Sequence, residues 1–215
     1  MKLVAILGSK GGTGKTTLAH TLSYGATLAG YPTTLVHTDQ RPPVKGSRPY
    51  DYVDCSRNYA QITKLIKDRA DDEGYLVIDG AGNRPHLDLW LTGSMDLVLV
   101  PVTNSAEDVR CALQDLARFD DPRVRVIINR WPANRLVRMV MQRYVNELPD
   151  SRVAGLLPEV GGVRVFLEDQ DWETPSTKVN NQARRLFRLV ENNLNTVAEL
   201  PPFDKSAGVT RVSVP

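Results

Sequence analysis

The chain has 215 residues, of which 41% are hydrophobic and 24% charged, and its formal net charge is +2 at pH 7. This length can bury one well-packed core without requiring a second domain. The composition excludes a disordered chain, and no apolar run approaches the roughly 18 residues that span a membrane. Cys55 and Cys111 lack metal-ligand spacing, so we expect packing roles for them in a reducing cytoplasm.

Short runs rich in Val, Ile and Leu alternate with amphipathic stretches along the chain. Runs that are hydrophobic on both faces are typical of parallel strands covered by helices. The expected strands are residues 3–7, 33–36, 76–78, 97–102, 124–128 and 153–157. The expected helices, which form the crossovers, are residues 16–29, 61–70, 106–119, 134–148 and 182–200. The sequence therefore predicts an α/β fold, a mainly parallel twisted sheet with helices on both faces.

Prolines and glycines mark the irregular segments. Residues 41–50 contain three prolines and a glycine, which obstruct both helix and strand pairing, so we expect a mobile surface loop after the second strand. Pro201 and Pro202 end the last helix. We therefore expect one domain over residues 1–200 and a C-terminal tail over residues 201–215.

Residues 9–17 read Ser-Lys-Gly-Gly-Thr-Gly-Lys-Thr-Thr and lie between the first strand and the first helix. Glycines let backbone N–H groups turn around phosphate oxygens, and the helix presents its positive end to the same anion. Lys15 is expected to neutralise the β and γ phosphates of ATP, and the Thr16 hydroxyl to coordinate Mg²⁺. The expected nucleotide contacts are Lys10, Gly11, Gly12, Thr13, Gly14, Lys15, Thr16 and Thr17.

A second lysine distinguishes this loop from the simplest P-loop pattern, which has glycine at the position of Ser9. The string Lys-Gly-Gly-Thr-Gly-Lys-Thr-Thr resembles the deviant P-loop of the ParA/MinD family of ATPases. The resemblance implies an ATP-bound homodimer in which Lys10 reaches the phosphates of the partner subunit. Lys10 would then act as a catalytic charge stabiliser supplied in trans, beside Lys15 in its own subunit.

Val36-His37-Thr38-Asp39, after the second strand, resembles the Asp-x-Asp segment of this family. Asp39 keeps the second acid, which implies a catalytic role in positioning the attacking water or its Mg²⁺. His37 replaces the first acid, so the rate of hydrolysis stays open. The alternative is that Asp39 only starts the turn before Arg41.

Leu76-Val77-Ile78-Asp79 is an apolar strand that ends in an acid. This arrangement matches the second acidic motif of P-loop ATPases, in which the carboxylate holds Mg²⁺ indirectly. Gly80 and Gly82 would allow the following loop to close on the γ phosphate. The alternative is a simple turn at the end of a strand.

Two later segments resemble the parts of this family that contact the adenine base of ATP. Ile127-Ile128-Asn129-Arg130 resembles the strand end whose Asn hydrogen-bonds adenine, and Leu157-Pro158 resembles the segment that packs against the base. We therefore expect Asn129, Leu157 and Pro158 to bind the nucleotide.

Basic residues are concentrated in two segments, residues 123–143 and 178–188, neither of which contains an acid. Helices here would carry arginines on exposed faces, a pattern suited to sequence-independent, salt-sensitive binding of DNA phosphates. The expected DNA contacts are Arg135, Arg138, Arg143, Arg184, Arg185 and Arg188. The alternative is that both are merely solvated helix faces.

The resemblance is greatest to short plasmid-partition ParA proteins, which bind nucleoid DNA non-specifically as ATP dimers. It implies a cytoplasmic, nucleoid-associated ATPase that partitions or positions a plasmid or other cargo. A ParB-like or other cargo adaptor protein would stimulate hydrolysis. No MinD-type amphipathic membrane helix is evident after residue 200, so no membrane partner is expected.

Two other functions use the same fold and stay open at this stage. One is a metabolic or kinase enzyme, although no tyrosine follows Tyr144 to form the tyrosine cluster of a bacterial tyrosine kinase. The other is a nucleotide-binding scaffold with very slow turnover, which His37 keeps open.

Overall fold

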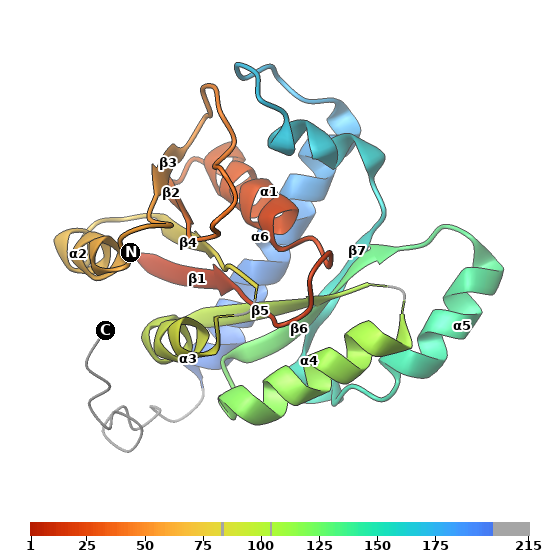
Figure 1. The fold of residues 1–215 in the computed structure, drawn as a ribbon. Coiled ribbons are helices and arrows are strands. Elements are labelled where there is room, and N and C mark those ends of the chain that lie inside the picture. The colour runs from red at the N-terminus through yellow and green to blue at the C-terminus, as the bar shows by residue number, and fades with distance from the viewer. Residues whose placement is uncertain (83, 104, 200–215) are drawn as a thin grey trace.

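The computed structural model describes residues 1–82, 84–103 and 105–199, and a parallel seven-stranded sheet forms its centre (Figure 1). The strand order is β3-β2-β4-β1-β5-β6-β7. The strands are β1 (Lys2–Ile6), β2 (Thr33–His37), β3 (Asp51–Asp54), β4 (Tyr75–Asp79), β5 (Leu97–Val102), β6 (Val124–Trp131) and β7 (Val153–Pro158). All neighbouring strands pair in parallel, which confirms the predicted α/β class.

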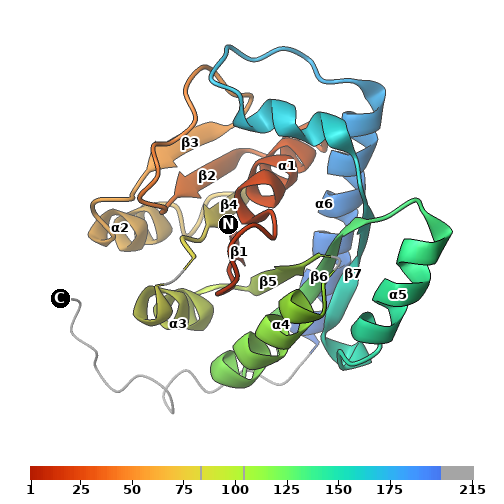
Figure 2. The ribbon, with the colours of Figure 1, turned by 45° about the vertical axis from the view of Figure 1, so that its right-hand side comes forward.

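Helices cover both faces of the sheet (Figures 1 and 2). The α-helices are α1 (Lys15–Leu28), α2 (Ala60–Asp68), α3 (Pro85–Ser94), α4 (Ala106–Phe119), α5 (Arg135–Val145) and α6 (Thr177–Ala198). Two short 3₁₀ segments, η1 (Asp150–Arg152) and η2 (Gly161–Leu167), flank β7. In the described residues, no helix is long and apolar enough to cross a membrane.

The alternation of side chains along β1 shows why the strands are apolar throughout. Val4 and Ile6 are buried in a core beneath α1 and α6. Ala5 and Leu7 are buried on the other face, in a core with α2, α3 and α4. A strand with helices on both sides has no solvent face, so each such aliphatic side chain can contribute about 1.5–3 kcal/mol of transfer free energy.

All six predicted strands and all five predicted helices are present, but β3 and α3 were not predicted. β3 has four residues, an aspartate at each end and only partial burial, so it lacks the apolar run of an inner strand. α3 begins at a proline and has weak amphipathic character. Such helices give little periodic signal, although Pro at the first helical position is itself favourable.

Residues 41–50 form neither helix nor strand, as predicted. The loop is tied to the segment before α6: the Lys45 N–H donates to Asp169 Oδ1 at 2.8 Å and the Ser47 N–H to Asp171 Oδ1 at 3.1 Å. Arg48 adds bonds to backbone carbonyls of that segment. The predicted mobility of the loop stays a prediction, and the predicted tail, residues 201–215, lies outside the described residues.

Close contact between α1 and α6 supplies a test of the packing. A β-carbon added at Gly25 of α1 would lie 2.3 Å from the Ala183 carbonyl oxygen and 3.0 Å from Phe187 Cβ. Because that carbonyl belongs to a helix backbone, Gly25→Ala should reduce the free energy of unfolding by at least about 2 kcal/mol, as measured by chemical denaturation.

Gly93→Ala is the matched control. Gly93 lies on an exposed part of α3, where an added β-carbon meets nothing within 4 Å. The substitution should raise the free energy of unfolding by about 0.5–1 kcal/mol through helix propensity. Equal stability of the two variants would contradict the described packing of α1 on α6.

Candidate active site

The loop between β1 and α1 forms an open cradle of backbone groups. Gly12 and Gly14 have φ angles of 82° and 94°, in the left-handed region that favours glycine. A β-carbon at Gly14 would also lie 2.7 Å from Asn129 Nδ2. Gly14 is the N-cap of α1 and has no side chain. The N–H groups of the first turn are therefore available to an anion.

Lys15 lies beneath this cradle with only 8% of its surface exposed. Its Nζ donates a hydrogen bond to the Lys10 carbonyl at 2.8 Å. A β-carbon at Gly82, in the loop after β4, would lie 3.3 Å from the same Nζ. Burial lowers the pKa of Lys15, and the nearby Asp79 carboxylate opposes that shift. The ammonium group thus lies between the P-loop and the loop after β4, and its contact with phosphate stays a prediction.

Asp79 ends β4 and is 1% exposed. Neither of its carboxylate oxygens has a hydrogen-bond partner among the described residues. A buried, unpaired carboxylate is costly, so this position fits a cation or ordered water. No group of three His, Cys, Asp or Glu within the described residues could hold a metal. The single buried carboxylate of Asp79 fits Mg²⁺, which keeps several waters and takes other ligands from bound phosphates.

His37 fills the space beside Asp79. Its Nε2 lies 2.9 Å from the Arg41 carbonyl oxygen. Its Nδ1 lies 3.6 Å from Asp79 Oδ2, close enough for charge attraction but too long for a hydrogen bond. Burial lowers the pKa of His37, but Asp79 and the Arg41 carbonyl raise it more, so the net shift is upward. His37 therefore attracts the Asp79 carboxylate, whereas an acidic residue at position 37 would repel it.

Asp39 follows the end of β2, and its carboxylate forms an ion pair with Arg41. Arg41 donates from Nη2 at 2.6 Å, from Nε at 3.0 Å and from its backbone N–H at 3.1 Å. Burial raises the pKa of Asp39, but these hydrogen bonds and the positive charge lower it below its usual value. The backbone bond is the turn contact of the alternative interpretation. The catalytic and metal-binding roles of Asp39 stay predictions.

Asn129 and its neighbour Arg130 lie against the P-loop from β6. Asn129 Nδ2 donates to the Thr13 carbonyl at 2.9 Å, and its Oδ1 accepts from the Arg130 N–H at 3.0 Å. Arg130 has a φ of 54° and its Nη1 lies 3.4 Å from the Gly12 carbonyl oxygen. Sequence reasoning missed Arg130 as a site residue, although a basic residue directly after Asn129 was a usable signal.

The other predicted base contacts lie at the end of β7. Leu157 is fully buried in the core beneath α1 and α6. Pro158 is half-buried, and its carbonyl accepts a hydrogen bond from Gln182 at 3.0 Å. Of the two, Pro158 has the surface that a base could contact. Their binding roles stay predictions.

A polar cluster on the other side of the P-loop was also missed. Asp115 of α4 accepts hydrogen bonds from the Ser9 N–H at 2.8 Å and the Ser9 hydroxyl at 3.0 Å. Arg118 Nη2 lies 3.5 Å from both Asp115 Oδ1 and Asp88 Oδ2, and Asp88 belongs to α3. Asp115 and Asp88 are 3% and 2% exposed. This cluster joins the start of the P-loop to α3.

The predicted DNA contacts fall on opposite faces of the sheet. α6 belongs to the core beneath α1, whereas Tyr144 and Val145 of α5 pack on the core that includes α4. All six predicted contact arginines are exposed. Arg123, by contrast, is buried and pairs with Asp121 at 2.5 Å. The two arginine groups therefore do not form one continuous surface in a single copy of the chain.

The exposed side of α5 carries apolar residues. Leu136 and Val140 are 73% and 51% exposed, whereas Leu148, just after the helix, is buried. Met139 is 57% exposed beside them. α5 therefore presents apolar and basic side chains together.

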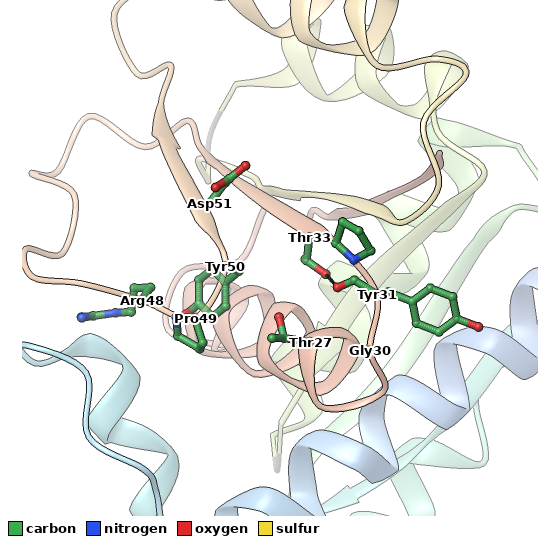
Figure 3. A pocket seen from close by; sticks show the side chains of 9 residues that line it. Thr27, Gly30, Tyr31, Thr33, Arg48, Pro49, Tyr50 and Asp51 are labelled. Carbon is green, nitrogen blue, oxygen red and sulfur yellow. Dashed lines mark hydrogen bonds between the residues drawn. The ribbon is translucent and has the colours of Figure 1, made fainter.

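A hollow of about 510 Å³ lies away from the P-loop, between the end of α1 and the starts of β2 and β3 (Figure 3). Tyr31, Arg48 and Asp51 line it, and the Tyr31 carbonyl accepts a hydrogen bond from the Thr33 hydroxyl at 3.0 Å. No P-loop residue lines this hollow. The geometry for phosphate binding lies instead at the carboxyl ends of β1 and β4.

Comparisons with known proteins identify the family and the fold. Residues 4–172 match the family described as the CobQ/CobB/MinD/ParA nucleotide binding domain. No curated protein sequence matches the chain significantly.

Three solved structures illustrate the fold. An ATP complex of McdA from Cyanothece has 13% identity and a TM-score of 0.61, over 94% of this chain and 98% of that one. The cell division ATPase MinD of Pyrococcus furiosus has 18% identity and a TM-score of 0.63, over 89% and 98%. A candidate plasmid partition protein of Borrelia burgdorferi bound to AMPPNP has 15% identity and a TM-score of 0.64, also over 89% and 98%. These likenesses establish the P-loop α/β fold.

Asp88, the buried acid on α3, should make the stability of the protein depend on pH. Burial raises the pKa of Asp88 from 3.8 to about 6, with Arg118 opposing the shift and Asp115 adding to it. Between these values the folded chain binds more protons than the unfolded chain, so Asp88 makes the free energy of unfolding fall as pH rises. Relative to Asp88→Asn, the wild type should lose about 1–3 kcal/mol of stability between pH 4 and pH 7.

Denaturation at several pH values measures this difference. Asp72→Asn, an exposed substitution after α2, is the control and should give a profile parallel to the wild type. A parallel profile for Asp88→Asn as well would contradict the raised pKa of the buried acid.

Proposed function

Because the chain belongs to the CobQ/CobB/MinD/ParA family of nucleotide-binding domains, we propose that it is an ATPase that dimerises on ATP to position cargo on DNA. The observation that carries the proposal is the buried Lys15 ammonium, held by the Lys10 carbonyl at the open end of α1. A γ phosphate entering the cradle would replace that carbonyl as the partner of Lys15. The other P-loop residues would surround the phosphates with backbone N–H groups.

The two lysines have different roles in this proposal. Lys15 binds phosphate within its own subunit. Lys10 precedes the cradle and is only partly buried, so its side chain is free to reach the phosphates of a second copy. A cation supplied across the interface makes dimerisation depend on ATP and stabilises charge during phosphoryl transfer.

Thr16, Asp79 and Asp39 are the residues that would hold Mg²⁺, whose chemistry here is to neutralise the β and γ phosphates. Asp39 would also orient the attacking water once Arg41 releases its carboxylate. Asn129 would bind adenine through its amide, with Pro158 beside the base. Hydrolysis then removes the γ phosphate and returns the protein to the monomer.

DNA binding is assigned to the exposed arginines of α6 and α5. Arg184 and Arg188 lie one helical turn apart, with Arg185 beside them, and form a basic face suited to phosphates. On α5, Arg135, Arg138 and Arg143 lie among exposed apolar side chains that phosphates do not contact. We therefore give α6 the larger part of the DNA affinity.

The wider proposal is a cytoplasmic, nucleoid-associated ATPase domain over residues 1–200, with residues 201–215 as a tail. A ParB-like or other cargo adaptor would stimulate hydrolysis. The related candidate plasmid partition protein supports this class of cargo.

A nucleotide-binding scaffold with very slow turnover is the second candidate. It is favoured by His37, which attracts the carboxylate of Asp79, and by Arg41, which occupies Asp39. Phosphate release measured with and without DNA separates the two candidates, because only the ATPase gives multiple turnovers.

Because Lys15 and Lys10 have different proposed roles, replacing each should cause a different defect. Lys15→Ala should abolish measurable ATP binding, since no other buried cation faces the cradle in the described residues. Lys10→Ala should bind ATP but fail to dimerise. Isothermal titration and sedimentation measure the two steps, and an ATP-dependent dimer of Lys10→Ala would contradict the role in trans.

Charge reversal tests the DNA surface. Arg184→Glu with Arg188→Glu should weaken DNA binding at low salt about tenfold or more and reduce its salt dependence, while leaving ATP binding intact. Lys64→Glu with Lys67→Glu, on exposed positions of α2, makes the same change in net charge and should have a smaller effect. Unchanged DNA affinity in the α6 variant would remove α6 from the interface.

A further inference from the structure

One stripe of α4 runs beside the start of the P-loop. Glu107, Cys111 and Asp115 lie at successive turns of this helix. Asp115 is buried and accepts two hydrogen bonds from Ser9, the residue before Lys10. We propose that Asp115 is a positioning residue: by holding Ser9, it fixes the direction in which Lys10 leaves the P-loop toward a second copy of the chain. This inference rests on the proposed ATP-dependent dimer.

Ser9 is held at two points by one carboxylate oxygen. Asp115 Oδ2 accepts from the backbone N–H at 2.8 Å and from the hydroxyl at 3.0 Å. Two bonds to a charged acceptor fix both the peptide plane and the side-chain rotamer of Ser9. The next residue along the chain is Lys10, so its backbone inherits that orientation. A glycine at position 9, as in the simplest P-loop pattern, lacks the second bond.

Lys10 is held from the other side as well. Its carbonyl accepts from Lys15 Nζ at 2.8 Å and from the Thr13 hydroxyl at 3.4 Å. In the proposed ATP-bound state Lys15 turns to phosphate, and the bonds of Ser9 to Asp115 and of the Thr13 hydroxyl to the Lys10 carbonyl remain to hold the backbone on either side of the Lys10 α-carbon. The side chain of Lys10 is the part left to move.

Asp115 is itself held in place. Arg118, one turn further along α4, lies 3.5 Å from Asp115 Oδ1 and 3.5 Å from Asp88 Oδ2. The oxygen that binds Ser9 is thus separate from the oxygen that faces Arg118. Because Asp88 belongs to α3, which follows the loop after Asp79, the position of Lys10 is connected to the helix beyond that loop. A lysine that must meet phosphates across an interface benefits from such preorganisation.

The contact predicts a defect in dimerisation with little change in nucleotide affinity. Ser9→Ala removes the hydroxyl bond and keeps the backbone bond, and Asp115→Ala removes both. Ser9→Ala leaves the contacts of Lys15 and the cradle unchanged, so binding of an ATP analogue to that monomer should stay within about twofold of wild type. The dissociation constant of the ATP-bound dimer should rise about tenfold in Ser9→Ala and further in Asp115→Ala, within the usual range for charged hydrogen bonds. The kcat should fall in parallel, with KM unchanged.

Three comparisons separate positioning from packing. Ser9→Thr keeps the hydroxyl and should restore dimerisation. Ser9→Ala should have no further effect in an Asp115→Ala background, because both substitutions remove the same contact. Asp96→Asn is the matched control: Asp96 also accepts a backbone N–H, from Leu3 at 2.8 Å, but at the opposite end of β1. It should leave dimerisation unchanged.

The outcomes distinguish this inference from the proposed function. A wild type that stays monomeric with ATP overturns the proposed dimer. A wild type that dimerises, with Ser9→Ala dimerising equally well, overturns the role of Asp115 alone. The role of Asp115 is also overturned if Ser9→Ala loses nucleotide binding and this loss explains its whole dimerisation defect. Ser9 is exposed, so its variants keep the test decisive even where Asp115→Ala does not fold.

Discussion

The opposite charges of Lys15 and Asp79 are both buried at the ends of adjacent elements, and the site depends on their interaction. Lys15 has the Lys10 carbonyl as its partner, whereas the Asp79 oxygens have no hydrogen bond in the described residues. Moving two charges out of water costs several kcal/mol per ion unless other groups complete their surroundings. A ligand that carries phosphate for Lys15 and a hydrated cation for Asp79 completes both. The charge pattern therefore supports the metal-bound nucleotide of the proposed function over a neutral substrate.

Strand order brings these groups together. Ile6 at the end of β1 pairs in register with Asp79 at the end of β4, and His37 at the end of β2 pairs with Asp79 from the other side. In an open parallel sheet, loops at the carboxyl ends of the strands meet at one edge, and ligands bind there. The hollow between α1, β2 and β3 lies at the amino ends of the strands. Its size does not make it the active site.

The sequence correctly predicted those features whose signal lies within a short run of consecutive residues. Apolar runs predicted the inner strands because burial on both faces removes every polar position, and the P-loop is a continuous string. Contacts between distant residues were not predictable. Asp115 reads as an ordinary acid on an amphipathic helix, and only the fold brings it to Ser9, 106 residues earlier. Arg123 reads as part of a basic segment, yet it is buried beside Asp121. The sign of a charge is evident in a sequence, but its burial depends on tertiary packing.

His37 shows how one substitution changes the balance of this site. An acid there would face Asp79 at the distance of the His37 ring, 3.6 Å, and two carboxylates so close repel each other unless a cation lies between them. Histidine replaces that repulsion with attraction, which is why its pKa is raised. This attraction adds to the strand pairing and to the bond from the Thr38 hydroxyl to the Asp79 carbonyl, which hold the ends of β2 and β4 together. In the proposed function, a cation at Asp79 would have to compete with this attraction, so His37 would weaken the binding of Mg²⁺ there.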